Sequence, residues 1–261
     1  MTKEQNKIFV ADEQMEFKMK RYPEYVDFKE GLKEEGFEIV PIDKADKATL
    51  DKINVPLVRS ELFLHNQYYP LLDCVEKYIT NLAMGMEDLA KFMGASEWYF
   101  DYKYEKSDTY KESSKQEATI GGKVPKYGGG DISVGKTDIS QTTQMQISDI
   151  KRKIKLKGSK LEPKELEKYI QDKGINLDAF GDFFKKSVKD YISGEKISTN
   201  ETDIDKTEQI NQYVEIGRSC AVNPKIKFVD AKLKLNLDKK FGNGRKYRTR
   251  FHYKMIFSEK V

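Results

Sequence analysis

The spacing of apolar residues changes from helical to extended at Gly94, and this change constrains the fold more than any other feature of the sequence. Over residues 70–93, apolar side chains recur every three or four positions, which predicts one long helix with a buried face. Gly94 stands where a left-handed cap ends such a helix. From Trp98 to Tyr104, aromatic residues alternate with other residues, which predicts a half-buried strand. A helix that leads directly into a sheet is therefore expected.

The same two patterns recur elsewhere and make the fold class α+β. Helices are predicted over 23–35, 163–173 and 177–193, with Asn176 as the N-cap of the last, and strands over 37–42 and 145–157. At the C-terminus, alternation over 231–238, a glycine-rich turn and alternation over 247–257 predict an antiparallel hairpin. We therefore expect a mixed or antiparallel twisted sheet with a C-terminal β-hairpin, on which the long helix (about 70–93) and the helical pair (about 163–193) pack.

The chain is predicted to form one domain over residues 1–261, because its length suits a single core. Two segments lack a clear hydrophobic period. Residues 107–148 are rich in Ser, Thr, Gly, Lys and Gln, which predicts a flexible segment or polar strands. Residues 195–207 are polar and predict an exposed connection.

The hydrophobic runs and the cysteines of the sequence indicate the cellular compartment. The sequence has no apolar run of about 18 residues, the length that a membrane-spanning helix requires. The apolar run Ile8–Ala11 is too short for a secretory signal, and the only cysteines, Cys74 and Cys220, do not form a disulfide framework. These features predict a cytoplasmic protein.

Residues suited to catalysis or metal binding are scarce. His65 and His252 are the only histidines, neither has a partner at a metal-ligand spacing, and the carboxylates form no clustered pair. We therefore expect a non-enzymatic protein without a metal or a cofactor.

One motif points to a different function. Residues 130–137, GDISVGKT, match the phosphate-loop pattern through Gly130, Gly135, Lys136 and Thr137. A working phosphate loop needs a buried strand before it and an amphipathic helix after it, because the helix N-terminus helps to bind the phosphates. The flanking residues here are glycine-rich on one side and polar on the other. Nucleotide binding through these four residues is therefore an alternative to the main interpretation.

Basic residues recur at every second position of the predicted strands, which places them on one face. The candidate anion-binding residues are Lys151, Lys153, Lys155, Lys157, Lys232, Lys234, Arg248, Arg250 and Lys254. If their strands are neighbours in one sheet, they form a positive surface of roughly ten charges that attracts anionic lipid or nucleic acid. The plainer interpretation is that exposed lysines keep the sheet soluble and protect its edges.

These observations favour a protein that engages an anionic membrane surface. Tyr247, Phe251 and Tyr253 alternate with Arg248 and Arg250, so aromatic and basic side chains face opposite ways, which disfavours base stacking on nucleic acid. The polar segment 107–148 has a composition that could rearrange into membrane strands, as in pore-forming β-proteins, by architectural analogy alone. Nucleic-acid binding and protein interaction are the alternatives, and oligomerisation stays open.

Overall fold

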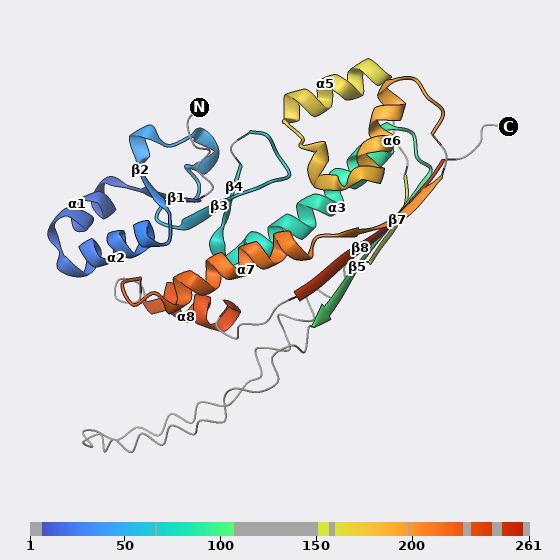
Figure 1. The fold of residues 1–261 in the computed structure, drawn as a ribbon. Coiled ribbons are helices and arrows are strands. Elements are labelled where there is room, and N and C mark those ends of the chain that lie inside the picture. Colours follow the sequence, from blue (N-terminus) through green and yellow to red (C-terminus); the bar gives the residue numbers. More distant parts are fainter. Residues whose placement is uncertain are drawn as a thin grey trace.

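The computed structural model describes residues 7–65, 67–106, 151–156, 160–197, 199–226, 231–241 and 247–257. Over these residues the chain forms two four-stranded sheets, one mixed and one antiparallel, and the long helix α3 (Cys74–Phe92) runs from the first sheet to the second (Figure 1). The predicted α+β class is confirmed. The predicted segment 107–148 and the predicted strand residues 145–150 lie outside the described residues.

The first sheet is built near the N-terminus. It has the order β2 (Glu38–Pro41), β1 (Lys7–Ala11), β3 (Pro56–Arg59), β4 (Tyr68–Pro70), in which only the β1–β2 pair is parallel. Helices α1 (Glu13–Arg21) and α2 (Pro23–Glu34) lie beside it, and 3-10 turns span Ile42–Lys44 and Lys47–Thr49. Phe9 of β1 meets Phe28 of α2 edge to face at 5.6 Å, so one side of this sheet joins the main core.

The second sheet has the order β6 (Lys151–Lys155), β5 (Glu97–Lys106), β8 (Tyr247–Ile256), β7 (Asn200–Asp205), and every neighbouring pair is antiparallel. The predicted alternation of β5 is confirmed, since Trp98 and Phe100 are buried on one face. Phe184 packs against that face, with ring centroids 6.3 Å from Trp98 and 5.6 Å from Tyr253. This aromatic layer holds the helical pair on the sheet.

The predicted helices are confirmed, with two refinements. A 3-10 turn over Leu71–Asp73 precedes α3, and Gly94 follows it with φ of 88°. The helical pair consists of α5 (Pro163–Lys173) and α6 (Asp182–Ile192), joined through the 3-10 turn η4 (Leu177–Phe180). Asn176 caps η4 by accepting a hydrogen bond from the backbone N–H of Asp178 at 3.2 Å. Gly181, with φ of 87°, separates η4 from α6, which explains why 177–193 is not one continuous helix.

The predicted strand over 231–238 is wrong, because residues Ala231–Phe241 form helix α8. Strand β8 does end the chain in antiparallel pairs, but its partners are β5 and β7. Leu233, Leu237 and Phe241 are four residues apart, which suits one face of a helix equally well. Leu237 and Phe241 are buried, whereas Leu235, which a strand would place beside them, is 53% exposed.

The predicted exposed connection over 195–207 contains strand β7, and helix α7 (Thr207–Val222), which we did not predict, begins at its end. Charge explains the strand. Glu201 of β7 pairs with Lys254 of β8 at 2.7 Å, and Asp203 pairs with His252 at 2.8 Å. The polar composition of this segment suggests a loop, but its acidic residues pair with basic residues on the neighbouring strand β8.

Candidate functional site

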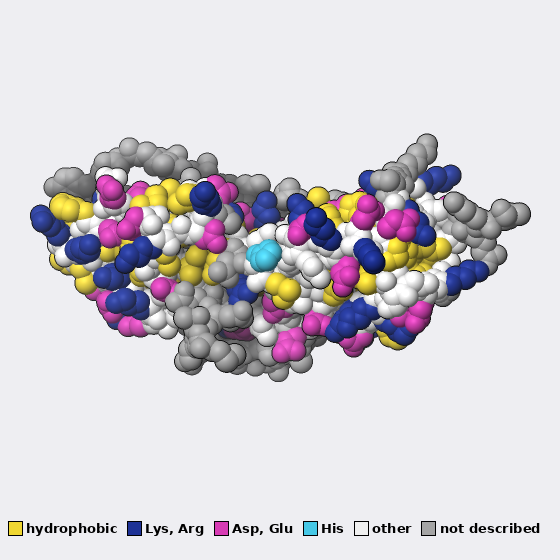
Figure 2. All heavy atoms as spheres, turned by 90° about the horizontal axis from the view of Figure 1, so that it is seen from above, with side chains coloured by type: hydrophobic (Ala, Val, Ile, Leu, Met, Phe, Trp, Pro, Cys, Tyr) yellow, Lys and Arg dark blue, Asp and Glu magenta, His cyan; other side chains and the backbone are white. Residues whose placement is uncertain are grey.

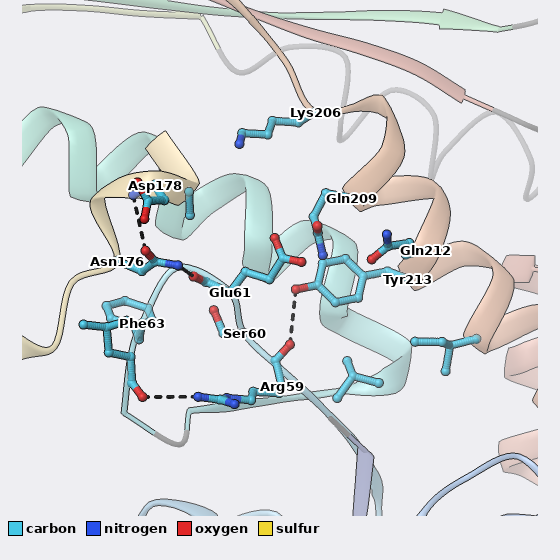
Figure 3. Close-up of a pocket in the computed structure, with 14 residues that line it drawn as sticks. Arg59, Ser60, Glu61, Phe63, Asn176, Asp178, Lys206, Gln209, Gln212 and Tyr213 are labelled. Carbon is cyan, nitrogen blue, oxygen red and sulfur yellow. Dashed lines mark hydrogen bonds between the residues drawn. The ribbon is translucent and has the colours of Figure 1, made fainter. Parts of the chain in front are cut away.

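A pocket of about 460 Å³ opens between the β3–β4 loop, η4 and the first half of α7 (Figure 3). Its size falls within the range of small-molecule sites in proteins. The residues that line it are Val58, Arg59, Ser60, Glu61, Phe63, Leu64, Asn176, Asp178, Ala179, Lys206, Gln209, Gln212, Tyr213 and Ile216. Most of them are polar, so the pocket suits a ligand with several hydrogen-bonding groups.

Hydrogen bonds from Asn176 hold the β3–β4 loop against the segment that follows α5. The Asn176 side-chain amide donates to the carbonyl of Glu61 at 2.9 Å, and the Asn176 backbone N–H donates to the carbonyl of Leu62 at 3.0 Å. Gly174 adopts φ of 59°, and a Cβ there would lie 2.2 Å from the His65 ring. Only glycine permits this close approach. One wall of the pocket is therefore fixed by contacts between distant parts of the chain.

Helix α7 supplies the opposite wall. Gln209, Gln212, Tyr213 and Ile216 are three or four residues apart, so they share one face of the helix. The Tyr213 hydroxyl donates to the carbonyl of Arg59 at 3.3 Å, as Figure 3 shows. This bond ties α7 to the end of β3.

Burial shifts the pKa values of two charged groups of the pocket, Lys206 and Glu61, whereas a hydrogen bond with Lys185 lowers the pKa of a third, Asp178. Burial of the Lys206 ammonium lowers its pKa, although nearby carboxylates such as Glu61 partly oppose this shift. Burial raises the pKa of the Glu61 carboxyl, and a side-chain hydrogen bond with Gln209 partly opposes the increase. Among the described residues, Lys206 has no ion pair. Its ammonium is thus a half-buried cation beside the pocket, where an anionic group would offset the cost of burial.

A buried hydrogen-bonded group supports the floor of the pocket. The Ser60 hydroxyl donates to the Tyr69 hydroxyl at 2.8 Å, and the Asn81 amide donates to the same oxygen at 2.9 Å. Ser60 is only 1% exposed. Its hydroxyl therefore positions the loop and does not face a bound ligand.

The structure places the described members of the predicted anion-binding set in two different surroundings. Lys151, Lys153 and Lys155 lie on β6, and Arg248, Arg250 and Lys254 lie on β8 of the same sheet, with β5 between the two strands. Lys232 and Lys234 lie on helix α8 and so do not join this sheet. Lys157 lies outside the described residues.

In the second sheet, the strands next to the basic strands β6 and β8 carry acidic residues. On β5, Glu97 is opposite Lys155 and Asp101 is opposite Lys151. On β7, acidic residues are opposite Lys254, His252 and Arg250 of β8. On the face of the molecule that Figure 2 shows, basic and acidic side chains are also interspersed. The second sheet therefore places acidic positions beside the basic ones, and anion binding by these residues stays a prediction.

The predicted nucleotide-binding residues Gly130, Gly135, Lys136 and Thr137 lie outside the described residues, so nucleotide binding stays a prediction. Within the described part of the chain, no group of three or more His, Cys, Asp or Glu side chains could hold a metal ion. No helix in that same part is both long enough and apolar enough to cross a membrane.

Comparison with protein-family models, with curated proteins and with solved structures gives no match. Fold and site together define the class of protein, an α+β protein of two sheets with a polar pocket beside the first. Sequence reasoning missed Lys206 and Glu61. The only signal was Glu61 itself, an acidic residue within the mostly apolar stretch 56–72.

Proposed function

We propose that the chain is a non-enzymatic binding protein whose pocket holds a small polar molecule through an anionic group. The observation that carries this proposal is the half-buried Lys206 ammonium beside the pocket, without an ion pair among the described residues. Lys206 also immediately precedes α7, whose N-terminus carries a partial positive charge. A carboxylate or phosphate bound here would interact with both.

The other lining residues narrow the class of ligand. Glu61 offers a carboxylate that accepts hydrogen bonds, and the amides of Gln209 and Gln212 both donate and accept. Phe63 and Ile216 add apolar contact area. The best-suited ligand is a small molecule with an anionic group at one end and hydrogen-bond donors, such as an ammonium or hydroxyl, at the other.

Replacement of Lys206 tests this proposal. Isothermal titration with acetate, succinate, glutamate and inorganic phosphate would show binding of at least one of them to the parent protein. Lys206→Met keeps the aliphatic stem but removes the charge, and we expect about a tenfold or larger loss of affinity, the usual effect of a lost charged hydrogen bond. Lys168→Met, at an exposed lysine of α5 outside the pocket, is the matched control. Equal affinities of the parent and Lys206→Met would contradict the proposal.

A separate observation keeps the anionic membrane as a second candidate partner. At the junction of α1 and α2, Phe17 and Tyr22 are each 47% exposed. Arg21 lies 4.5 Å from the centre of the Phe17 ring, and Lys18 lies 5.2 Å from that of Tyr25. Aromatic rings beside cations are typical of surfaces that contact lipid headgroups. This corner is a better candidate for membrane contact than the charge-balanced second sheet.

Co-sedimentation with vesicles tests the membrane candidate. The parent protein should bind phosphatidylserine-containing vesicles more strongly than phosphatidylcholine vesicles, and the double variant Phe17→Ser/Tyr22→Ser should bind several-fold less. Val222→Ser, at a residue that is 63% exposed on α7, is the control for a lost surface apolar group. No binding to either vesicle would remove this candidate, whereas salt-dependent binding to DNA or RNA instead would favour the nucleic-acid alternative.

A further inference from the structure

The two edge strands of the second sheet carry opposite charges. Strand β6 has the sequence KRKIK and β7 has the sequence NETDID, and within the described chain no strand lies beyond either. Apart from the β5–β6 and β7–β8 ladders, none of the backbone hydrogen bonds between described residues involves Lys151–Lys155 or Asn200–Asp205. Both edges thus offer backbone groups for a further strand.

We infer that the second sheet continues from one copy of the chain to the next, with β6 of one copy paired to β7 of its neighbour. Strand direction permits this continuation. Neighbouring strands alternate in direction across the order β6-β5-β8-β7, so β6 of a second copy would run antiparallel to β7 and repeat the pattern of the sheet. The inference does not depend on the proposed ligand of the pocket.

One register matches all the alternating charges. Cross-strand neighbours share a face, and the register links Glu201, Lys254, Tyr99 and Lys153 in one row across the sheet. The basic residues at alternate positions of β6 therefore lie on the same face as the acidic residues of β7. When Lys153 is placed opposite Asp203 of the next copy, Lys151 falls opposite Asp205 and Lys155 falls opposite Glu201. This arrangement repeats the pairing of acidic and basic strands that already exists inside the sheet.

The charges of the edge strands also favour a β6–β7 contact between copies over a β6–β6 or a β7–β7 contact. Two β6 edges, or two β7 edges, would place like charges opposite each other, which disfavours a symmetric dimer. Edge charges of one sign commonly prevent pairing, but these two edges complement each other. A contact between two different edges is head-to-tail, so it builds either a closed ring or an open filament.

Charge reversal at the central pair tests the inference. Sedimentation velocity over a concentration series should show self-association of the parent protein. Lys153→Glu alone and Asp203→Lys alone should each weaken it about tenfold, from the loss of one favourable pair and the gain of a repulsive one. The double variant Lys153→Glu/Asp203→Lys should restore self-association, because the pair is then reversed but still complementary. A parent that stays monomeric at every concentration would overturn the inference, as would a double variant no better than the singles.

Disulfide trapping gives a second test that leaves the sheet's other charges in place. Lys153→Cys/Asp203→Cys should form disulfide-linked oligomers on mild oxidation, visible as a ladder on a non-reducing gel. Within one copy, β5 and β8 separate these positions by about 14 Å, beyond the reach of a disulfide. The natural cysteines Cys74 and Cys220 are buried. Lys155→Cys/Asp203→Cys, which is out of register by two residues, should cross-link much less, and an equal yield would contradict the register.

Discussion

Lys206 and Lys186 carry the same ammonium group, but their surroundings shift the pKa in opposite directions. Burial lowers the pKa of Lys206, because a charged group loses hydration as it leaves water. A side-chain hydrogen bond with Asp190, one turn along α6, raises the pKa of Lys186. Lys186 is therefore a structural partner on an exposed helix face. The partial burial of the Lys206 ammonium costs free energy that an anionic ligand would offset. Residues with pKa values shifted by burial are common at functional sites.

This difference predicts selective chemical modification. Acylating reagents attack the neutral amine, so a lysine with a lowered pKa reacts at lower pH than one with a raised pKa. With limiting acetic anhydride at pH 8, Lys206 should be acetylated several-fold faster than Lys186, as measured by peptide mass spectrometry. A bound anion from the panel above should slow modification of Lys206 and leave Lys186 unchanged. Faster reaction at Lys186 would contradict the assigned environment.

At the level of the element, α8 shows how one sequence pattern fits two structures. The aromatic ring of Phe241 occupies the space beside Gly217 of α7, where a Cβ would lie 2.5 Å from the ring. Lys240 pairs with Glu76 of α3 at 2.7 Å. These contacts join α8 to two other helices. Burial of one face of α8 against them stabilises the helix more than the alternating sequence of this short segment favours a strand.

The helix at 231–241 predicts unequal effects at two leucines that a strand would place on the same face. Leu237→Ala should lower the free energy of unfolding by about 2–5 kcal/mol, because a fully buried side chain leaves a cavity. Leu235→Ala should change it by less than about 0.5 kcal/mol, because its side chain is largely exposed. Urea titration followed by circular dichroism measures both. Similar losses would indicate a strand.

At the scale of the whole molecule, the second sheet is assembled from segments far apart in the chain. Strand β5 pairs with β6 on one side and, about 150 residues later, with β8 on the other. Strand order therefore decides which charges become neighbours. The same order leaves a basic strand at one edge and an acidic strand at the opposite edge, on which the inferred assembly depends.

Local sequence alone was enough to predict the helices and strands whose buried apolar residues recur at a regular spacing. Helix α3, strands β5 and β8, the helical pair and the Asn176 cap follow from apolar spacing and from the residue types at helix ends. These features depend on contacts within a few residues, so the pattern is complete in the sequence. Short segments such as 231–241 fit either period, and there packing on other elements decides.

Tertiary structure alone decided the charge balance and the pocket. The basic residues of β6 and β8 were evident in the sequence, but the acidic residues beside them come from β5 and β7, through pairings that no local pattern encodes. Lys206 and Glu61 are about 145 residues apart, and each is unremarkable in its own segment. They become neighbours because the core, the Asn176 contacts and α7 bring three segments together. Burial then shifts both pKa values, since the loss of water depends on what surrounds a side chain in space.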